Sequence, residues 1–260
     1  MPYQHISRKP TTKKSPNELV LDQKMAGTSL KKIVKNYNIA AIPIKEDMID
    51  AVGGEENLYG LKYMTKTQES FERKVTSDQQ KYYPRYTSEQ VATTVQDAIR
   101  FTQIVSKENF ATEVNKTFNK LKQKGYKCIR VYNSWLAPLI SYKGVNALFR
   151  TPYGYTCELQ FHTKESMETK DKSHEYYEEY RLDSTSQKRK DELKKIMAEL
   201  SSELVSKHTP TGVNEIDGRF VTREHGLTEI YEQSDNEVST LTKPHTTEIQ
   251  CLWDINKKLF

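Results

Sequence analysis

Residues 142–163 read YKGVNALFRTPYGYTCELQFHT, and this stretch decides the fold. Two runs rich in β-forming residues, 144–151 and 155–162, are joined by a Pro152-Tyr153-Gly154 turn, which predicts two consecutive strands. In the second strand Glu158 and Gln160 point to the same face, because residues i and i+2 of a strand do so. Glu158 lies among Tyr155, Cys157, Leu159 and Phe161 in a strand expected to be largely covered, so a carboxylate here points to function as well as core.

The segments on either side of this stretch extend the same pattern. Residues 97–105, DAIRFTQIV, and 126–135 predict two further strands, separated by a helix over 109–124 that Gly125 ends. Downstream, the composition predicts helices over about 164–181 and 186–206. The fold class is therefore expected to be α+β, a mixed β-sheet of about five strands flanked by helices.

The remaining parts of the chain carry weaker patterns. Residues 1–57 are expected to form an N-terminal tail with one or two short helices, 58–212 the folded domain, and 213–260 a loosely structured C-terminal tail. The segment from Leu61 to about Ser77 has helical composition.

Composition limits the classes of function. The chain has 260 residues, a net charge of +5 and a mean hydropathy of −0.81. A modest positive charge favours acidic ligands such as nucleotides or RNA. The sequence contains no run approaching the roughly 18 apolar residues that cross a bilayer, and its start lacks a secretory signal. The three cysteines form no CxxC pair and do not suggest a disulfide framework. We therefore expect a cytoplasmic protein that does not bind membranes.

One candidate phosphate-binding strip lies in the predicted helix after Leu61. Lys66, Ser70 and Lys74 are spaced by four residues, so on a helix they would share one face, with Arg73 at its edge. Two ammonium groups and a hydroxyl along one face would bind polyphosphate oxygens. The alternative is an ordinary solvated helix face.

Acidic candidates begin the first strand and lie within the fourth. Asp97 and Arg100 open the strand at 97–105, while Glu158 and Gln160 share a face of the strand at 155–162. Two carboxylates from separate strands can hold Mg²⁺ and place a base near an attacking hydroxyl, as phosphoryl-type transfer requires. The alternative is that both are exposed charges on edge strands.

The segment Tyr142-Lys143-Gly144-Val145-Asn146 offers an aromatic ring that can stack on a base and an amide that can read a base or ribose edge. The alternative is an ordinary turn that leads into a strand. His162 and His174 have no partner at zinc-ligand spacing, and the sequence contains no GxxxxGK[ST] phosphate loop.

Taken together, the order of these motifs resembles the synthetase domain of the RelA/SpoT pyrophosphokinases. The chain presents a KxxxSxxxK segment, DAIRFT, YKGVN, ELQFHT and then SHEYYEEYR, over roughly residues 58 to 205. The closest resemblance is to the compact variants found in phage-linked and polymorphic-toxin proteins. Such a domain implies a nucleotidyltransferase-like α+β fold and transfer of pyrophosphate from ATP to a ribose hydroxyl of a purine nucleotide, or to an RNA 3′ end.

The resemblance also implies roles for individual residues. Lys66, Ser70 and Lys74 look like contacts to the ATP phosphates, and Asp97 looks like a magnesium ligand. Glu158 looks like the second ligand or the base that activates the acceptor hydroxyl, with Gln160 in support. The remaining implied contacts are Arg73 and Arg100 on the ATP side, and Tyr142, Lys143, Asn146, His162 and His174 on the acceptor side.

Two departures from the family pattern leave the acceptor open. The family places a glycine and then an arginine after the strand aspartate, whereas Arg100 follows Asp97 by three residues with no glycine between them; the family also has an arginine where this chain has His162. Partners implied by the resemblance are ATP, a nucleotide or RNA acceptor, and a neutralising antitoxin for a growth-inhibiting toxin. The rival hypotheses are a non-catalytic RNA- or protein-binding module on the same fold, and a phage structural or injected protein.

Overall fold

The centre of the molecule is a mixed β-sheet with strand order β1-β4-β3-β2-β7. The computed structural model describes residues 29–83, 85–137, 140–182, 184–216, 219–220 and 227–228. The strands of the sheet are β1 (Arg100–Ile104), β2 (Lys127–Asn133), β3 (Val145–Arg150), β4 (Thr156–His162) and β7 (Leu227–Thr228). Strand β1 runs parallel to β4, and the other neighbours are antiparallel. The α+β class and the mixed sheet predicted from the sequence are confirmed.

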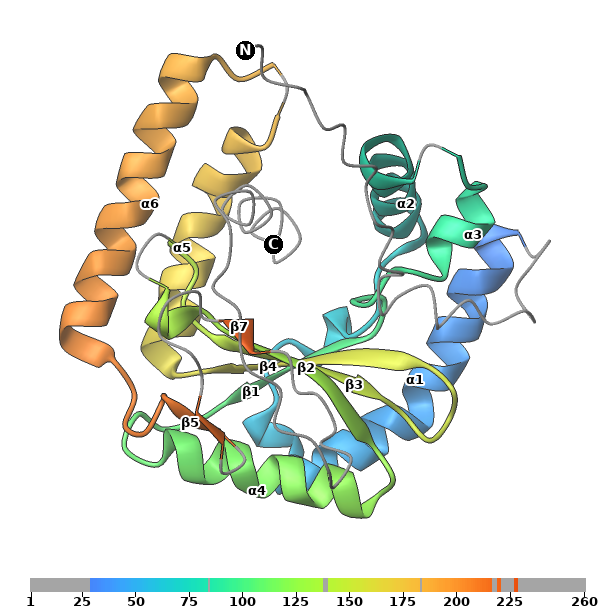
Figure 1. Cartoon of the computed structure of the whole chain (residues 1–260), viewed down its shortest axis with the longest axis horizontal. Helices are drawn as coiled ribbons and strands as arrows, with labels where there is room; N and C mark the ends of the chain where they lie inside the picture. Colours follow the sequence, from blue (N-terminus) through green and yellow to red (C-terminus); the bar gives the residue numbers. More distant parts are fainter. Residues whose placement is uncertain are drawn as a thin grey trace, which may run out of the picture.

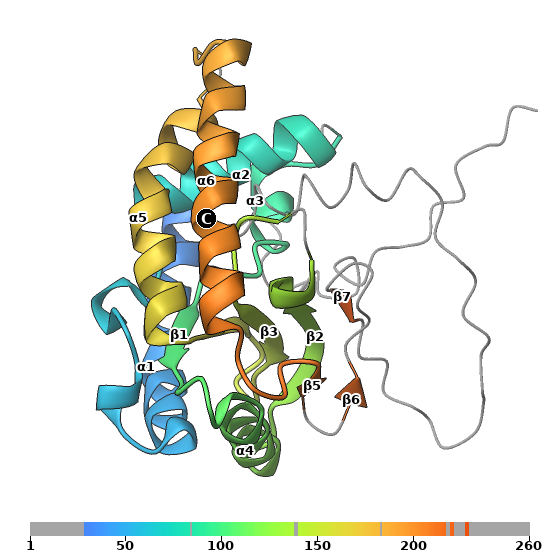
Figure 2. The same cartoon turned by 90° about the vertical axis from the view of Figure 1, so that its left-hand side faces the viewer.

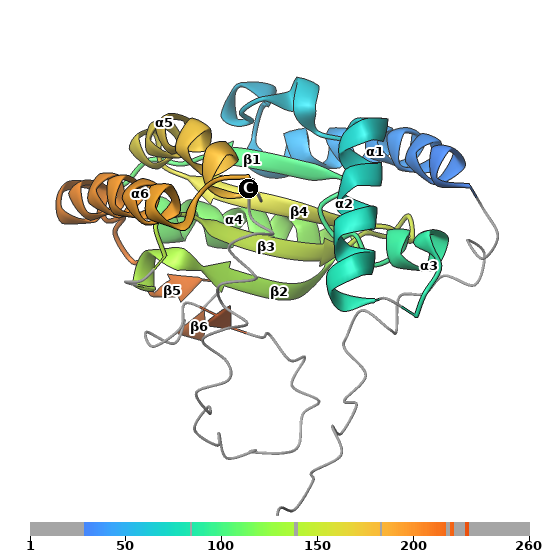
Figure 3. The same ribbon diagram turned by 90° about the horizontal axis from the view of Figure 1, so that it is seen from above.

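Helices cover the two faces of this sheet differently. They are α1 (Leu30–Val52), α2 (Gln68–Tyr82), α3 (Ser88–Ala92), α4 (Phe110–Gln123), α5 (Lys164–Tyr180) and α6 (Gln187–His208), and a second small sheet pairs β5 (Glu215–Ile216) with β6 (Arg219–Phe220). Helices α1 and α4 lie below the sheet in Figure 1, whereas α2 and the α5–α6 pair rise above it on opposite sides. Figure 3 shows the same separation from above, with the strands running between the two groups.

Alternation along the strands explains why one face is core and the other is polar. On β4, Cys157, Leu159 and Phe161 are fully buried. The Phe118 ring of α4 lies 5.6 Å from the Phe161 ring and 5.3 Å from the Phe149 ring of β3. The intervening residues of β4, Glu158, Gln160 and His162, therefore point to the opposite face, which is the face flanked by α2 and α5.

Helix α1 corrects the prediction for residues 1–57. Residues 30–52 form one continuous helix of 23 residues, and nine of its side chains are buried. They belong to the same core cluster as Phe71 and Leu159. The described part of this segment is therefore core rather than tail, because apolar residues recur every three to four positions as far as Val52. Gly53, at φ 85°, then ends the helix in the left-handed region that glycine favours. Residues 1–28 and most of the predicted C-terminal tail lie outside the described residues.

Helix α2 begins later than the sequence predicts. Thr67 is its N-cap and accepts a hydrogen bond from the Ser70 amide, so the helix begins at Gln68. A short 3₁₀ turn, Leu61–Tyr63, precedes it. Lys66 is thus not on the helix with Ser70 and Lys74, and the prediction of a three-residue strip on one helical face is wrong for Lys66. Thr67 follows Lys66 directly and is a favourable N-cap residue, so the helix begins after it and does not include Lys66.

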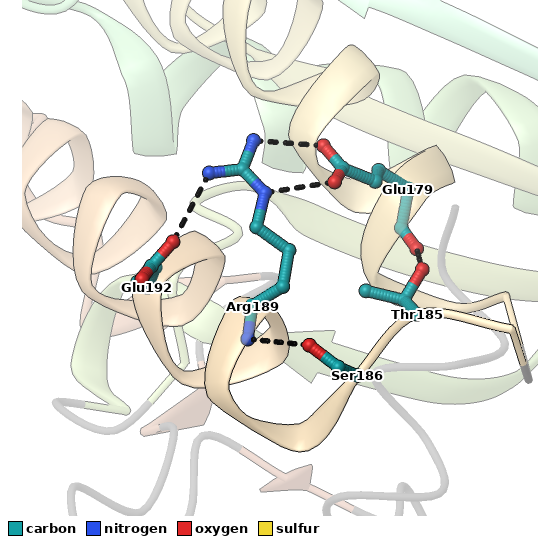
Figure 4. Close-up of polar contacts among 5 residues, drawn as sticks. All are labelled: Glu179, Thr185, Ser186, Arg189 and Glu192. Atoms are coloured by element: carbon teal, nitrogen blue, oxygen red, sulfur yellow. Dashed lines mark hydrogen bonds and ion pairs between the residues drawn. The ribbon is translucent and has the colours of Figure 1, made fainter.

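Helices α5 and α6 form an antiparallel pair beside the sheet (Figures 1 and 2). The turn between them is fixed by Arg189, whose Nε and Nη2 atoms donate to the two carboxylate oxygens of Glu179 at 2.8 and 2.9 Å (Figure 4). Thr185 donates to the Glu179 carbonyl, and Ser186 caps α6. Bidentate guanidinium pairs hold geometry better than single contacts, so this pair fixes α5 to α6 at their turn.

Candidate active site

The polar face of the sheet brings the two predicted carboxylates together. Arg100 of β1 lies opposite Glu158 of β4 in the parallel register, and the Glu158 amide donates to the Ile99 carbonyl at 2.9 Å. Because Asp97 lies two residues before Ile99, this pairing places Asp97 beside the start of both strands. The carboxylates come from positions 61 residues apart in the sequence, and they interact electrostatically in the folded chain.

Asp97 is held by Lys66. The Lys66 ammonium lies 2.9 Å from Asp97 Oδ2, and both side chains are largely buried, with 17 and 13% exposed. Their backbones are also joined, since the Lys66 amide donates to the Ala98 carbonyl at 3.1 Å and Thr65 pairs with Ile99. Lys66 therefore lies beside Asp97 on an extended segment rather than on a helix.

The two carboxyl groups have opposite pKa shifts. Burial alone would raise the pKa of Asp97, but the nearby charges of Lys66, Lys74 and Arg100 lower it. The pKa of Glu158 is raised by burial and by the negative charge of Asp97, against the opposing effects of Arg100 and Arg130. One carboxylate is thus kept ionised while the other is biased towards holding a proton, which is a common arrangement in acid–base catalysis.

A short hydrogen-bond chain fixes Glu158. Gln160 Nε2 donates to Glu158 Oε1 at 2.6 Å, and Lys170 Nζ of α5 donates to Gln160 Oε1 at 2.8 Å. Gln160 is fully buried, so its amide is oriented by these two partners. The predicted supporting role of Gln160 thus has a structural basis, and Lys170 is a further member of the site.

The acceptor-side residues form a second network. Tyr142 donates its hydroxyl hydrogen to Asn146 Oδ1 at 2.6 Å, and the same hydroxyl lies 2.9 Å from His162 Nε2. His162 Nδ1 lies 2.9 Å from Ser166 Oγ, and burial, Lys170 and Arg100 lower the pKa of His162 well below its ordinary value. The Tyr142 ring is only 3% exposed. Its stacking on an acceptor base stays a prediction, and it requires the side chains that cover the ring to move.

Gly144 leaves room for this network. A Cβ atom at this position would lie 2.7 Å from His162 Cε1 and 2.8 Å from the Tyr142 hydroxyl oxygen. We expect Gly144→Ala to destabilise the protein by about 1–3 kcal/mol, because both rings are held by hydrogen bonds and cannot yield freely. Urea unfolding of this variant beside Gly154→Ala tests the expectation. At Gly154 nothing lies within 4 Å of the added atom, so any loss there reflects only backbone strain at φ 84°. If the two variants have the same m-value and lose the same free energy of unfolding, the steric explanation is contradicted.

Lys143 points away from the acceptor side. Its ammonium donates to the backbone carbonyls of Ser134 at 3.0 Å and Ala137 at 2.7 Å, so it holds the connection between β2 and β3. Burial lowers the pKa of Lys143 to about 8. The predicted acceptor contact stays untested, but the side chain has a structural role that sequence reasoning did not foresee.

The lowered pKa of Lys143 predicts a pH dependence. Between pH 8 and the ordinary lysine pKa, the unfolded chain binds a proton that the folded chain has released, so stability rises with pH in this window. We expect the contribution of Lys143 to grow by on the order of 1–3 kcal/mol. Chemical unfolding at pH 7.5, 8.5 and 9.5 measures it. The rise should be smaller in Lys143→Met than in the wild type, and parallel curves would contradict the assignment.

The other predicted phosphate contacts lie on α2. Lys74 forms an ion pair with Asp78 at 3.1 Å, and its charge also acts on Asp97. Ser70 is half-buried, whereas Arg73 is exposed. His174 lies on α5, where its imidazole is 3.8 Å from Glu178. Within the described part of the chain, neither Arg73 nor His174 forms a hydrogen bond or ion pair with Asp97 or Glu158.

Sequence reasoning missed two cations at the site. Lys170 lies between Met167 and Ser173 on the buried stripe of α5, and a lysine at such a position was the available signal. Arg130 of β2 donates to Gln96 Oε1 at 2.9 Å and acts electrostatically on Glu158. The indication for Arg130 was weaker, because the neighbours of its strand in the sheet are not evident from the sequence.

The carboxylate pair fits a magnesium ion in one respect. Mg²⁺ is usually bound by one or two carboxylates together with substrate phosphates and water. Asp97 and Glu158 supply such a pair. The raised pKa of Glu158 reflects burial first and then repulsion by Asp97, and a divalent cation would relieve the repulsion. Among the described residues no group of three or more His, Cys, Asp or Glu could hold a metal by itself, so a cation here would need ligands from a substrate.

Comparison with known proteins gives structural neighbours only. No family model and no curated protein matches the chain. It is similar to the Type VI effector Tas1, solved with its immunity protein, at 20% identity and a TM-score of 0.44 over 68% of this chain and 96% of that chain. A GTP pyrophosphokinase family protein from Streptococcus pneumoniae is 16% identical, with a TM-score of 0.45 over 68% of this chain and 89% of that chain. Small alarmone synthetase 2 from Bacillus subtilis is 19% identical, with a TM-score of 0.47 over 68% of this chain and 94% of that chain. These values assign no activity. In the part of the chain that the structure describes, no helix is long and apolar enough to span a membrane.

Proposed function

We propose that this chain is a magnesium-dependent pyrophosphokinase that transfers the β- and γ-phosphates of ATP to a ribose hydroxyl of a purine nucleotide or of an RNA 3′ end. The observation that carries the proposal is the pairing of Asp97 with Glu158 on the polar face of the sheet, amid the positive charges of Lys66, Lys74 and Arg100. Phosphoryl-type transfer needs carboxylates to hold a metal ion or accept a proton, and cations to neutralise the phosphates. This group of side chains could supply both.

The bonds and charges of this reaction balance with residues of this chain. The acceptor hydroxyl oxygen attacks the β-phosphorus, a new oxygen–phosphorus bond forms, and the bond between the β-phosphorus and the bridging oxygen breaks, so AMP leaves with the bonding electrons. Glu158 is the group we expect to accept the hydroxyl proton when it is ionised, because a carboxylate with a raised pKa is a stronger proton acceptor. A bound magnesium ion would supply charge neutralisation to the phosphates.

Each cation has an expected part in this scheme. Lys66, Lys74 and Arg100 lie near Asp97 and would neutralise the phosphate oxygens as charge develops on them. Arg100 also lies opposite Glu158 in register. Gln160 holds Glu158 in one orientation through its 2.6 Å hydrogen bond. These contacts support the ATP side of the proposal more directly than the acceptor side, where Tyr142 is covered.

A transfer assay tests the proposal. The purified chain is incubated with Mg²⁺ and ATP labelled at the β-phosphate, together with GDP, GTP, ADP or tRNA as the acceptor. We expect AMP to form only when an acceptor is present, and the label to move to that acceptor. If AMP forms from ATP alone, labelled pyrophosphate would indicate hydrolysis, whereas label on a second ATP would identify ATP as the acceptor. No AMP under any of these conditions would count against the enzyme.

The rival binding-module hypothesis is tested in cells. If the chain inhibits growth by catalysis, expression of the wild type should arrest growth and expression of Glu158→Gln should not. A non-catalytic module would retain its effect in this variant, because the substitution removes one negative charge and leaves the shape of the side chain nearly unchanged.

A further inference from the structure

A second basic feature lies next to the carboxylate site. A cavity of about 750 Å³ separates the first two turns of α1 from the segment that leads into α2. Five of its eleven lining residues are lysines and none is acidic; the lysines are Lys31, Lys32, Lys35, Lys62 and Lys66. We call it the α1–α2 lysine pocket. Its volume falls within the range of about 300–1,000 Å³ that is typical of small-molecule sites.

Among the described residues, three lysines of this pocket have no acidic partner. Of the ion pairs among described residues, none includes Lys31, Lys32 or Lys35, whereas Lys124 pairs with both Asp47 and Asp50 near the other end of α1. The first turn of α1 carries no acid, and its N-cap residue Ser29 makes no side-chain capping bond. Lysines at a helix N-terminus oppose the helix dipole. The chain thus keeps an arrangement that an anion would relieve.

The pocket is connected to the catalytic carboxylates through Lys66. This side chain lines the pocket, and its ammonium also lies 2.9 Å from Asp97 Oδ2. An anion in the pocket would compete with Asp97 for this ammonium group. By reciprocity, a cation that binds Asp97 would release Lys66 to the anion.

We propose that the α1–α2 lysine pocket binds the phosphate chain of a nucleoside polyphosphate, and that this ligand shares Lys66 with Asp97. The ligand is expected to carry several negative charges, because four lysines of the lining form no ion pair among the described residues and the fifth, Lys66, is shared with Asp97. Naming the ligand a nucleotide rests on the proposed function, whereas the anion site itself does not. Lys31, Lys32 and Lys35 would then be substrate contacts outside the KxxxSxxxK motif.

Binding is measured by isothermal titration calorimetry in a Glu158→Gln background, so that no turnover occurs. The probes are inorganic tripolyphosphate, the ATP analogue with a methylene group between its α- and β-phosphorus atoms, and GTP. We expect the double variant Lys31→Gln/Lys35→Gln to bind tripolyphosphate about tenfold more weakly. The matched control is Lys188→Gln/Lys195→Gln, which removes two exposed charges from one face of α6 and should leave the affinity unchanged.

The outcomes separate the possibilities. Loss of affinity for the ATP analogue alone would assign the pocket to the donor, and loss for GTP alone would assign it to the acceptor. Equal affinity for tripolyphosphate in the double variant and the control would contradict the proposal that the α1–α2 lysine pocket binds an anion. If only a single-stranded oligoribonucleotide loses affinity, the nucleotide proposal is wrong and the lysines bind an RNA backbone. A wild type that binds tripolyphosphate but transfers nothing would leave the pocket in place and refute the proposed reaction.

Discussion

Replacing Glu158 by Gln should lower kcat for pyrophosphate transfer by on the order of 10³-fold, because the substitution removes both the proposed base and one of two metal-binding carboxylates. The same variant should not unfold more easily. Burial and Asp97 both disfavour the ionised form of Glu158 in the folded chain, so a neutral side chain removes a cost rather than a stabilising interaction.

Asp97→Asn provides the matched contrast. It should also abolish transfer, but it should lower the free energy of unfolding at neutral pH, because it removes the partner of Lys66 at 2.9 Å. Stability contributed by Asp97 is present above the ordinary aspartate pKa and is lost as the pH falls through its lowered folded value. Glu168→Gln, an exposed position on α5, serves as the control for both. A strongly destabilised Glu158→Gln variant, or one that retains activity, would contradict the assignment.

The second large effect is expected at Lys170. Lys170→Met removes the donor to Gln160 Oε1 and so frees the amide that orients Glu158. We expect kcat to fall by about 10- to 100-fold, as is typical when a group that orients a catalytic ligand is lost. The KM for ATP should change little, because Lys170 acts through Gln160 rather than through the donor phosphates.

Two further variants separate positioning from general structural damage. Lys170→Arg keeps a charged donor and should recover most of the lost activity, whereas Lys172→Met removes an exposed lysine of the same helix and should have no effect. Burial and Arg100 lower the pKa of Lys170 to about 8. The wild-type kcat should therefore decline above pH 8, and this decline should be absent in Lys170→Arg. An equal loss in all three variants would exclude a positioning role.

The strands of this fold could be predicted because their signals are local. The turn at Pro152-Tyr153-Gly154 and the alternation along 155–162 were sufficient to predict β3 and β4. Helix α1 was underestimated because its pattern is spread over 23 residues and includes Pro43. Its place in the core depends on contacts with α4 and α2 that no local pattern reveals.

Some residues of the candidate site could likewise be predicted from local sequence, whereas others depend on tertiary contacts. Asp97, Glu158 and Gln160 were identified because they stand out in otherwise apolar segments or match a motif. Lys170 was missed because its partner, Gln160, lies ten residues away, and the hydrogen bond depends on how α5 returns over the sheet. Tyr142 was assigned from its motif alone, and its burial beneath neighbouring side chains follows from tertiary packing.

The late start of α2 has a mechanical consequence. Lys66 is tied to the strand segment by its backbone and to Asp97 by its side chain, whereas Ser70 and Lys74 belong to the helix that begins after Thr67. Under the proposed function, the phosphate chain of the donor would therefore contact side chains from two different elements, an extended segment and a helix. Phe71 and Val75 anchor α2 in the core, so the helix holds Lys74 in place relative to Lys66 and Asp97 before any ligand binds.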